Sequence, residues 1–256
     1  MDFDQRSLRA RLVDAVVRVL EPLPAVRAGW EGGSAAFENV DEYSDIDLCF
    51  IVESETSYER LYAVARQALE TVSPVSMTHD LPPGRYYKLA EGGEFLFVDL
   101  CFFRTDSGDH PLEMERHGVV RSLFDKDDWL KGRRLDETAL TTKREARLGE
   151  LQGWFAASQS FVRKAILRGH EVEALSSFWG YTLKPLAELL RMRYCPVRWD
   201  FGTRYLHRDL PEEVYREFRD LAFVTSLEEL EAKLATAEAW GIRLFHELGP
   251  ETSNTV

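Results

Sequence analysis

The spacing of hydrophobic positions divides the chain into a first half of mixed pattern and a second half that is almost entirely helical in pattern. In the first half, short apolar runs typical of strands alternate with stretches at helical spacing. The predicted strands are 25–30, 45–52, 75–79, 86–89, 94–103 and 119–124, and the predicted helices are 4–20, 35–39 and 57–72. The pattern predicts an α+β domain with a mixed sheet flanked by helices, and places the last strand at a sheet edge.

Strand signals nearly vanish after about residue 136, where long amphipathic stretches predict helices at 141–168, 171–194, 211–223 and 226–248. Pro185 lies inside the second of these stretches, and a proline in a helix interior predicts a kink or a split. The aromatic residues of this half fall at helical spacings, which predicts that most of them lie in the core of a bundle. We therefore expect two domains, 1–132 and a helical bundle at 133–256.

Composition supports a folded chain and narrows its partners. The 256 residues are 45% hydrophobic and carry a net charge of −12, which disfavours non-specific binding to nucleic acid. Three widely spaced cysteines fit reduced thiols and form no zinc or redox spacing. The polar N-terminus does not resemble a signal peptide, and no run reaches the roughly 18 apolar residues of a membrane span. These features predict a cytoplasmic protein without a membrane partner.

Three acidic residues stand out in the predicted sheet. Asp45 and Asp47 are two positions apart on one strand, so both carboxylates should project from the same face. Such a pair repels unless a cation lies between the carboxylates, and Mg²⁺ prefers carboxylates, water and phosphate as ligands. Asp99 lies in an otherwise apolar strand, where an isolated charge would be costly. If the two strands are neighbours, the three acids meet and suit a transfer that uses two metal ions.

A second feature, Gly32-Gly33-Ser34, lies shortly before the acidic pair. Two glycines let the backbone approach phosphate oxygens closely, and a following helix offers free N–H groups. Ser34 can donate a hydrogen bond to a phosphate, cap that helix, or do both. No P-loop lysine motif is present, which argues against a kinase or ATPase built on that loop.

Together, 30–34, 44–48 and Asp99 resemble the signature of the nucleotidyltransferase superfamily that includes polymerase β and antibiotic adenylyltransferases. The resemblance covers about residues 25–128, and the second half resembles the helical bundle of the antibiotic-modifying members. It implies transfer of a nucleoside monophosphate, AMP from ATP or another NTP, to a hydroxyl of a small molecule such as an aminoglycoside, with release of pyrophosphate. It also implies two Mg²⁺ ions, with Asp45 and Asp47 as ligands and Asp99 as ligand, base or both.

The chain departs from the family signature beside the expected triphosphate site. Ala35 and Ala36 follow Ser34 where many relatives carry a basic residue, so few basic side chains are left there to contact the triphosphate. In antibiotic-modifying members basic residues of the helical half contact the triphosphate, which makes Lys184 and Arg204 the candidates here. A solvated charge or a contact in a homodimer is the alternative for both. Two other functions stay open: a protein adenylyltransferase of the antitoxin type, and a nucleotide-binding protein without catalysis.

Overall fold

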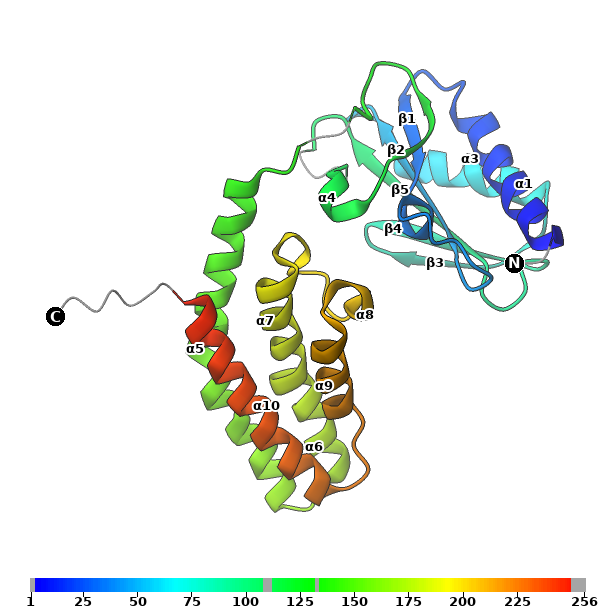
Figure 1. The fold of residues 1–256 in the computed structure, drawn as a ribbon. Helices are drawn as coiled ribbons and strands as arrows, with labels where there is room; N and C mark the ends of the chain where they lie inside the picture. Colours follow the sequence, from blue (N-terminus) through cyan, green and yellow to red (C-terminus); the bar gives the residue numbers. More distant parts are fainter. Residues whose placement is uncertain (1–2, 108–111, 132–133, 250–256) are drawn as a thin grey trace. The chain divides into compact units, whose positions relative to one another are not determined.

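A computed structural model describes residues 3–107, 112–131 and 134–249 (Figure 1). The chain divides into two compact units, Met1–Leu135 and Asp136–Val256. The predicted domain boundary, between residues 132 and 133, lies outside the described residues. None of the described helices combines the length and the apolar character needed to cross a membrane.

The first unit is built on one six-stranded sheet with the strand order β3-β4-β5-β2-β1-β6. The strands are β1 (Val26–Glu31), β2 (Ile46–Val52), β3 (Val75–Leu81), β4 (Gly84–Leu89), β5 (Phe97–Arg104) and β6 (Arg121–Asp125). The central pair, β2 and β5, is parallel, whereas all other neighbouring strands are antiparallel. The predicted mixed sheet is confirmed, and so is the edge position of its last strand.

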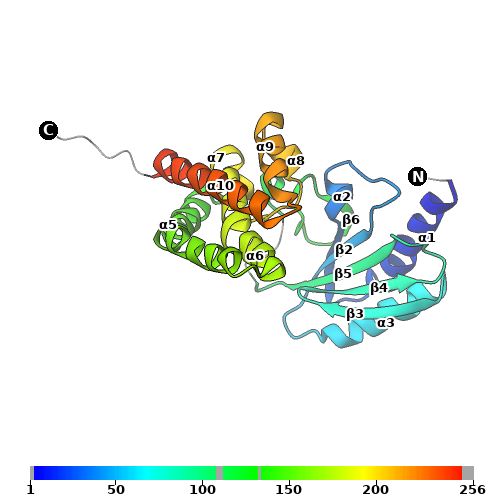
Figure 2. The ribbon, with the colours of Figure 1, turned by 90° about the horizontal axis from the view of Figure 1, so that it is seen from below.

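Two helices, α1 (Phe3–Leu20) and α3 (Tyr58–Glu70), cover one face of this sheet (Figures 1 and 2). The apolar stripe of α1 packs on alternate residues of β2 and β5, including Leu48 and Leu100, which are fully buried. On the opposite face a smaller apolar cluster surrounds Trp30 and Ile51. Because strand residues alternate between faces, Asp47 lies on the face away from the two long helices.

The second unit contains only helices among its described residues. They are α5 (Glu137–Leu167), α6 (Glu171–Phe178), a π-helical turn (Trp179–Leu183), α7 (Lys184–Tyr194), a short 3₁₀ turn (Pro196–Arg198), α8 (Leu206–Asp209), α9 (Glu212–Ala222) and α10 (Leu227–Leu248). In place of the kink or split predicted at Pro185, a π-helical turn separates α6 from α7 while the chain stays helical. Proline has no N–H to continue the hydrogen-bond ladder, and the wider π-helical turn directly before α7 accommodates that gap.

The prediction that the aromatic residues of this unit lie mostly in its core is wrong for four of the six at 154–181, namely Trp154, Phe161, Trp179 and Tyr181. Phe155 and Phe178 are buried, but Trp154 and Phe161 are 54% and 41% exposed. Each exposed ring comes one position before a buried residue of α5, so it lies about 100° around the helix from the buried stripe. The ring of Phe161 lies between the other two, with its centre 6.0 Å from that of Trp154 and 5.4 Å from that of Tyr181, which is 38% exposed. They form an aromatic surface.

A buried ion pair fixes the end of α7. Arg191 and Asp209 have side chains that are 0% and 1% exposed, and their closest charged atoms lie 2.6 Å apart. Arg191 also donates hydrogen bonds to the carbonyl oxygens of Gly202, Arg198 and Arg204. The guanidinium therefore holds the irregular segment between α7 and α8.

Candidate active site

Two of the three acids lie side by side at the start of the parallel strand pair, and the third comes just before it. Asp47 of β2 and Asp99 of β5 are direct register partners, and Asp45 comes immediately before β2. In-register parallel strands present such partners side by side on one face. The charge of Asp45 also acts on Asp99. The prediction that these two strands are neighbours is confirmed.

The carboxyl group of Asp99 is half-buried and lies near other acidic side chains. Burial raises its pKa above the ordinary value, and the negative charge of Asp45 raises it further. Tyr86 and Cys101 donate hydrogen bonds to this carboxylate, which act in the opposite direction, and the Cys101 Sγ lies 3.7 Å from Oδ1. A cation placed beside Asp99 would favour its ionised form.

Two glycines leave room for the acidic side chains. Gly33 has a φ of +54°, and a Cβ added there would lie 1.7 Å from Oδ2 of Asp47. A Cβ on Gly84 would lie 2.6 Å from Oδ1 of Asp99. The Gly32 N–H donates to the carbonyl oxygen of Asp47 at 2.9 Å, which holds the glycine turn against β2. Only residues without a side chain permit this close approach of backbone to carboxylate.

Ser34 does not cap the helix that follows it. That helix, α2 (Gly33–Ala36), begins one residue before Ser34, because the positive φ of Gly33 turns the chain earlier than predicted. The Ser34 Oγ is buried and has no hydrogen-bond partner among the described residues. A buried hydroxyl without a partner costs about 1–3 kcal/mol, so this oxygen suits a bound ligand such as a phosphate.

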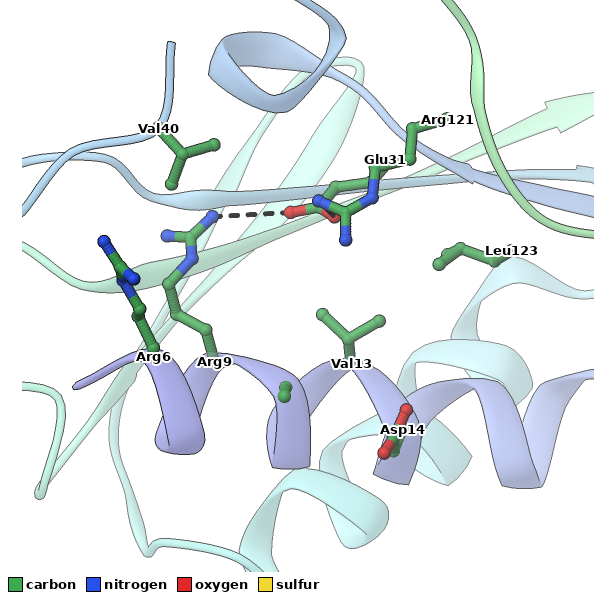
Figure 3. Close-up of a pocket in the computed structure, with 9 residues that line it drawn as sticks. Arg6, Arg9, Val13, Asp14, Glu31, Val40, Arg121 and Leu123 are labelled. Atoms are coloured by element: carbon green, nitrogen blue, oxygen red, sulfur yellow. Dashed lines mark hydrogen bonds and ion pairs between the residues drawn. The ribbon is translucent and has the colours of Figure 1, made fainter. Parts of the chain in front are cut away.

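Behind the acids lies a cluster that sequence patterns did not indicate. Arg9 of α1 donates to the Ser44 carbonyl at 2.7 Å and to Glu31 at 3.4 Å, and Arg121 contacts the other oxygen of Glu31 at 3.2 Å. Arg9, Glu31 and Arg121 line a cavity of about 500 Å³ between α1 and the edge of the sheet (Figure 3). Arg9 sits among several surface arginines of α1, so its sequence context carried no signal.

The residues present fit a divalent cation as part of a substrate complex. Among the residues that the structure describes, no three acidic, histidine or cysteine side chains are close enough to hold a metal by themselves. Asp45, Asp47 and Asp99 would supply some of the oxygen ligands for Mg²⁺, with water and substrate phosphates completing the set. The partnerless Ser34 hydroxyl and the open backbone at Gly33 provide space and a donor for those phosphates.

Lys184 and Arg204 both belong to the helical unit and both are exposed. Lys184 is the first residue of α7, and the Arg204 guanidinium lies 5.7 Å from the ring centre of Tyr205. Their roles as triphosphate contacts stay predictions.

The helical unit contains a cavity of its own, of about 370 Å³. Trp154 and Tyr181 line it beside Gly180 of the π-helical turn. At its charged side Arg147 pairs with Glu188 at 2.8 Å and with Glu150 at 2.9 Å, which leaves this group of three with one net negative charge. Aromatic walls beside a negative charge suit a cationic or ring-bearing small molecule.

The chain is similar in structure to several solved nucleotidyltransferases. An aminoglycoside 6-adenyltransferase from Bacillus subtilis is 12% identical, with 94% of this chain and 89% of that chain covered and a TM-score of 0.37. A spectinomycin adenyltransferase from Enterococcus faecialis, solved with ATP and spectinomycin, is 9% identical over 98% of this chain and 100% of that chain, with a TM-score of 0.38.

A c-di-GMP synthase from Capnocytophaga granulosa is 12% identical, with 95% of this chain and 80% of that chain covered and a TM-score of 0.33. No protein-family model and no curated protein sequence matches the chain. At identities and TM-scores this low, the activity of the chain has to be inferred from its own residues.

Proposed function

We propose that this chain is a Mg²⁺-dependent nucleotidyltransferase that moves a nucleoside monophosphate, AMP from ATP in the first instance, to a hydroxyl of a small molecule. The observation that carries the proposal is the in-register pair Asp47 and Asp99 beside Gly33 and the partnerless hydroxyl of Ser34. Phosphoryl-type transfer requires three things close together: carboxylates, a hydrogen-bond donor for phosphate oxygens, and backbone that a phosphate can approach closely. We call these residues, together with Asp45, the acid site.

Each residue of the acid site has a distinct part in the proposed reaction. Asp45 and Asp47 hold Mg²⁺, which when bound neutralises the phosphates and makes the α-phosphorus more electrophilic. Ser34 donates to an oxygen of the leaving pyrophosphate, and Gly33 lets that group approach the backbone. Asp99 either contributes to the metal site or accepts the proton of the attacking hydroxyl. Both roles need the ionised carboxylate, and Mg²⁺ beside Asp99 would favour that form.

For the acceptor we propose a ring-bearing, positively charged small molecule, with an aminoglycoside-like antibiotic as the first class to test. The cavity of the helical unit supports this choice through its aromatic walls and the net negative charge of Arg147, Glu150 and Glu188. The net charge of −12 points in the same direction, since an acidic protein attracts cations. Trp154→Ala should weaken acceptor binding and leave binding of Mg²⁺·ATP unchanged.

The proposal is tested by incubating the protein with Mg²⁺, ATP labelled at the α-phosphate and a panel of aminoglycosides and other antibiotics. We expect label on one class of acceptor, release of pyrophosphate, and neither with Asp47→Asn. Transfer by that variant at the wild-type rate would refute the assignment. Label on a co-purified protein would instead favour an adenylyltransferase of proteins. Binding of Mg²⁺·ATP without any transfer would favour a non-catalytic nucleotide-binding protein.

A further inference from the structure

We propose that Arg9 is a positioning residue that ties the glycine turn carrying Ser34 to the strand carrying Asp45 and Asp47. The inference deepens the proposed function and rests on it for its effect on nucleotide binding. Arg9 belongs to the first helix and contacts the Ser44 carbonyl and Glu31, which lie next to the acid site, rather than the substrate.

Arg9 contacts the residue that precedes each of the two segments, the glycine turn and the strand with its acids. Its side chain is 9% exposed, and its guanidinium donates to the Ser44 carbonyl at 2.7 Å and to Glu31 Oε1 at 3.4 Å (Figure 3). Ser44 directly precedes Asp45, and Glu31 directly precedes Gly32. One guanidinium therefore fixes the last residue before the turn and the last residue before the first acid.

The charges around Arg9 are those of the site itself. Burial lowers the pKa of Arg9, and the negative charges of Glu31, Asp45 and Asp47 act in the opposite direction. A buried guanidinium is costly unless acceptors and counter-charges surround it. Here the acceptors in contact with Arg9 are Glu31 and the Ser44 carbonyl, while Asp45 and Asp47 act on the guanidinium only through their charge. Moving either segment would therefore take a contact away from a buried cation.

Glu31 is anchored from a second side. Arg121 at the start of β6 contacts Glu31 Oε2 at 3.2 Å, and its own side chain is 64% exposed, against 6% for Glu31. Glu31 thus bridges two cations, one buried and one at the surface (Figure 3). The surface ion pair should contribute less to positioning than the buried one, because water screens it.

The segment 32–45 is the part that Arg9 should immobilise. The Gly32 N–H bond to the Asp47 carbonyl closes the segment next to β2, and Arg9 fixes the peptide that leads into Asp45. Without that bond the carbonyl of Ser44 can rotate, and the carboxylate of Asp45 rotates with the chain. A misplacement of about 1 Å at a reacting group is enough to cost about 100-fold in rate.

The test compares Arg9→Met, Arg9→Lys and Arg121→Met in the full chain, with Arg18→Met as the matched control. Arg18 is an exposed arginine of the same helix. The first readout is the Mg²⁺-dependent affinity for a fluorescent ATP analogue. We expect a loss of about tenfold or more for Arg9→Met, a smaller loss for Arg9→Lys, about twofold for Arg121→Met and no change for Arg18→Met.

The second readout is hydrogen exchange of the amides in 32–45, which needs no ligand. Exchange should accelerate in Arg9→Met and be partly restored in Arg9→Lys. If Arg9→Met does not fold, as judged by circular dichroism, the Arg9→Lys and Arg121→Met variants decide. Wild-type affinity together with wild-type exchange in the folded variants would overturn the proposal.

A double-mutant cycle separates positioning from general stability. If Arg9 acts through the acids, Arg9→Met should cause little further loss of Mg²⁺-dependent affinity in an Asp47→Asn background. Full additivity would overturn the positioning role. If the wild-type protein binds no Mg²⁺·ATP, the proposed function fails. The hydrogen-exchange comparison then still shows whether Arg9 immobilises residues 32–45.

Discussion

Two groups of buried or half-buried polar side chains, one in each unit, differ in how many of their hydrogen bonds are made within the chain. Arg191 in the helical unit is fully enclosed, and Asp209 and three carbonyl oxygens accept its hydrogen bonds. In the acid site, Asp99 carries a raised pKa and Ser34 a buried hydroxyl without a described partner. A buried charge whose hydrogen bonds are all made within the chain serves the fold. A buried polar group that lacks such partners can still bind a ligand.

The largest expected effect comes from removing a charge from the acid site. Asp47→Asn should lower transfer by about 1,000-fold or more, since an essential charged group at the reacting centre is lost. The free energy of unfolding should stay close to that of the wild type, because the variant removes repulsion between neighbouring carboxylates. Steady-state kinetics and urea unfolding check the two parts. A large loss of stability would place Asp47 in the same class as Arg191.

The reverse pattern is expected for the buried pair. Arg191→Met should cost about 3–5 kcal/mol of unfolding free energy, because Asp209 loses one of its two contacting cations and three carbonyl oxygens lose their Arg191 donor. Adding Asp209→Leu should recover only part of this loss, since those carbonyl oxygens still lack the Arg191 donor and Arg198 loses its contact with Asp209. Urea unfolding measures both variants. In folded molecules of either variant the affinity for Mg²⁺·ATP should fall far less than in Asp47→Asn, and only as far as Arg204, whose carbonyl Arg191 holds, contributes to triphosphate binding. A loss as large as that of Asp47→Asn would contradict the comparison.

Two glycines with positive φ allow backbone strain to be separated from damage to the site. Gly33 and Gly93 have φ values of +54° and +65°, but only Gly33 has an acidic side chain where a Cβ would lie. Both alanine variants should lose about 1 kcal/mol of stability from backbone strain. Gly33→Ala should in addition lose about 100-fold in transfer, because the new methyl group displaces Asp47. Equal activity of the two variants would refute the contact.

The smallest effect concerns pH. The pKa of Asp99 is raised in the folded protein, so between its ordinary and its raised pKa the folded state binds more protons than the unfolded state. Stability without divalent cations should therefore fall as the pH rises through that window. Asp99→Asn should remove this dependence and be more stable at neutral pH by less than about 1 kcal/mol, because solvent screens a half-exposed group. Urea unfolding at a series of pH values measures it.

Much of the fold was accessible from the pattern of apolar residues. The strands of the first unit and the helices of the second follow their predicted ranges within a few residues, because long periodic runs specify both type and approximate position. The exposed rings of Trp154 and Phe161 were misplaced in the core. Helical spacing shows which residues share a face, but it does not show which face packs when aromatic side chains lie on more than one side of a helix.

The acidic residues of the acid site could be predicted from the sequence, but the residues that contact them could not. Asp45, Asp47 and Asp99 could be named because charge in an apolar strand is conspicuous in a sequence. Tyr86 was missed because its contact with Asp99 depends on strand register. Cys101 was missed because it was interpreted as a small hydrophobic residue, although it lies two positions from Asp99 on the same strand. Arg9 reaches the site from a distant helix, and only the packing of that helix distinguishes it from Arg18.

The parallel pairing of β2 and β5 has a consequence for how the chain folds. Asp47 and Asp99 are 52 positions apart, and the strand that carries Asp99 has to insert between β4 and β2. Pairings over such long separations form slowly, whereas the local hairpins β3–β4 and β4–β5 close early. The acids should therefore come together late on the folding pathway. During synthesis the repulsion among the three carboxylates would arise only once the surrounding scaffold is in place to contain it.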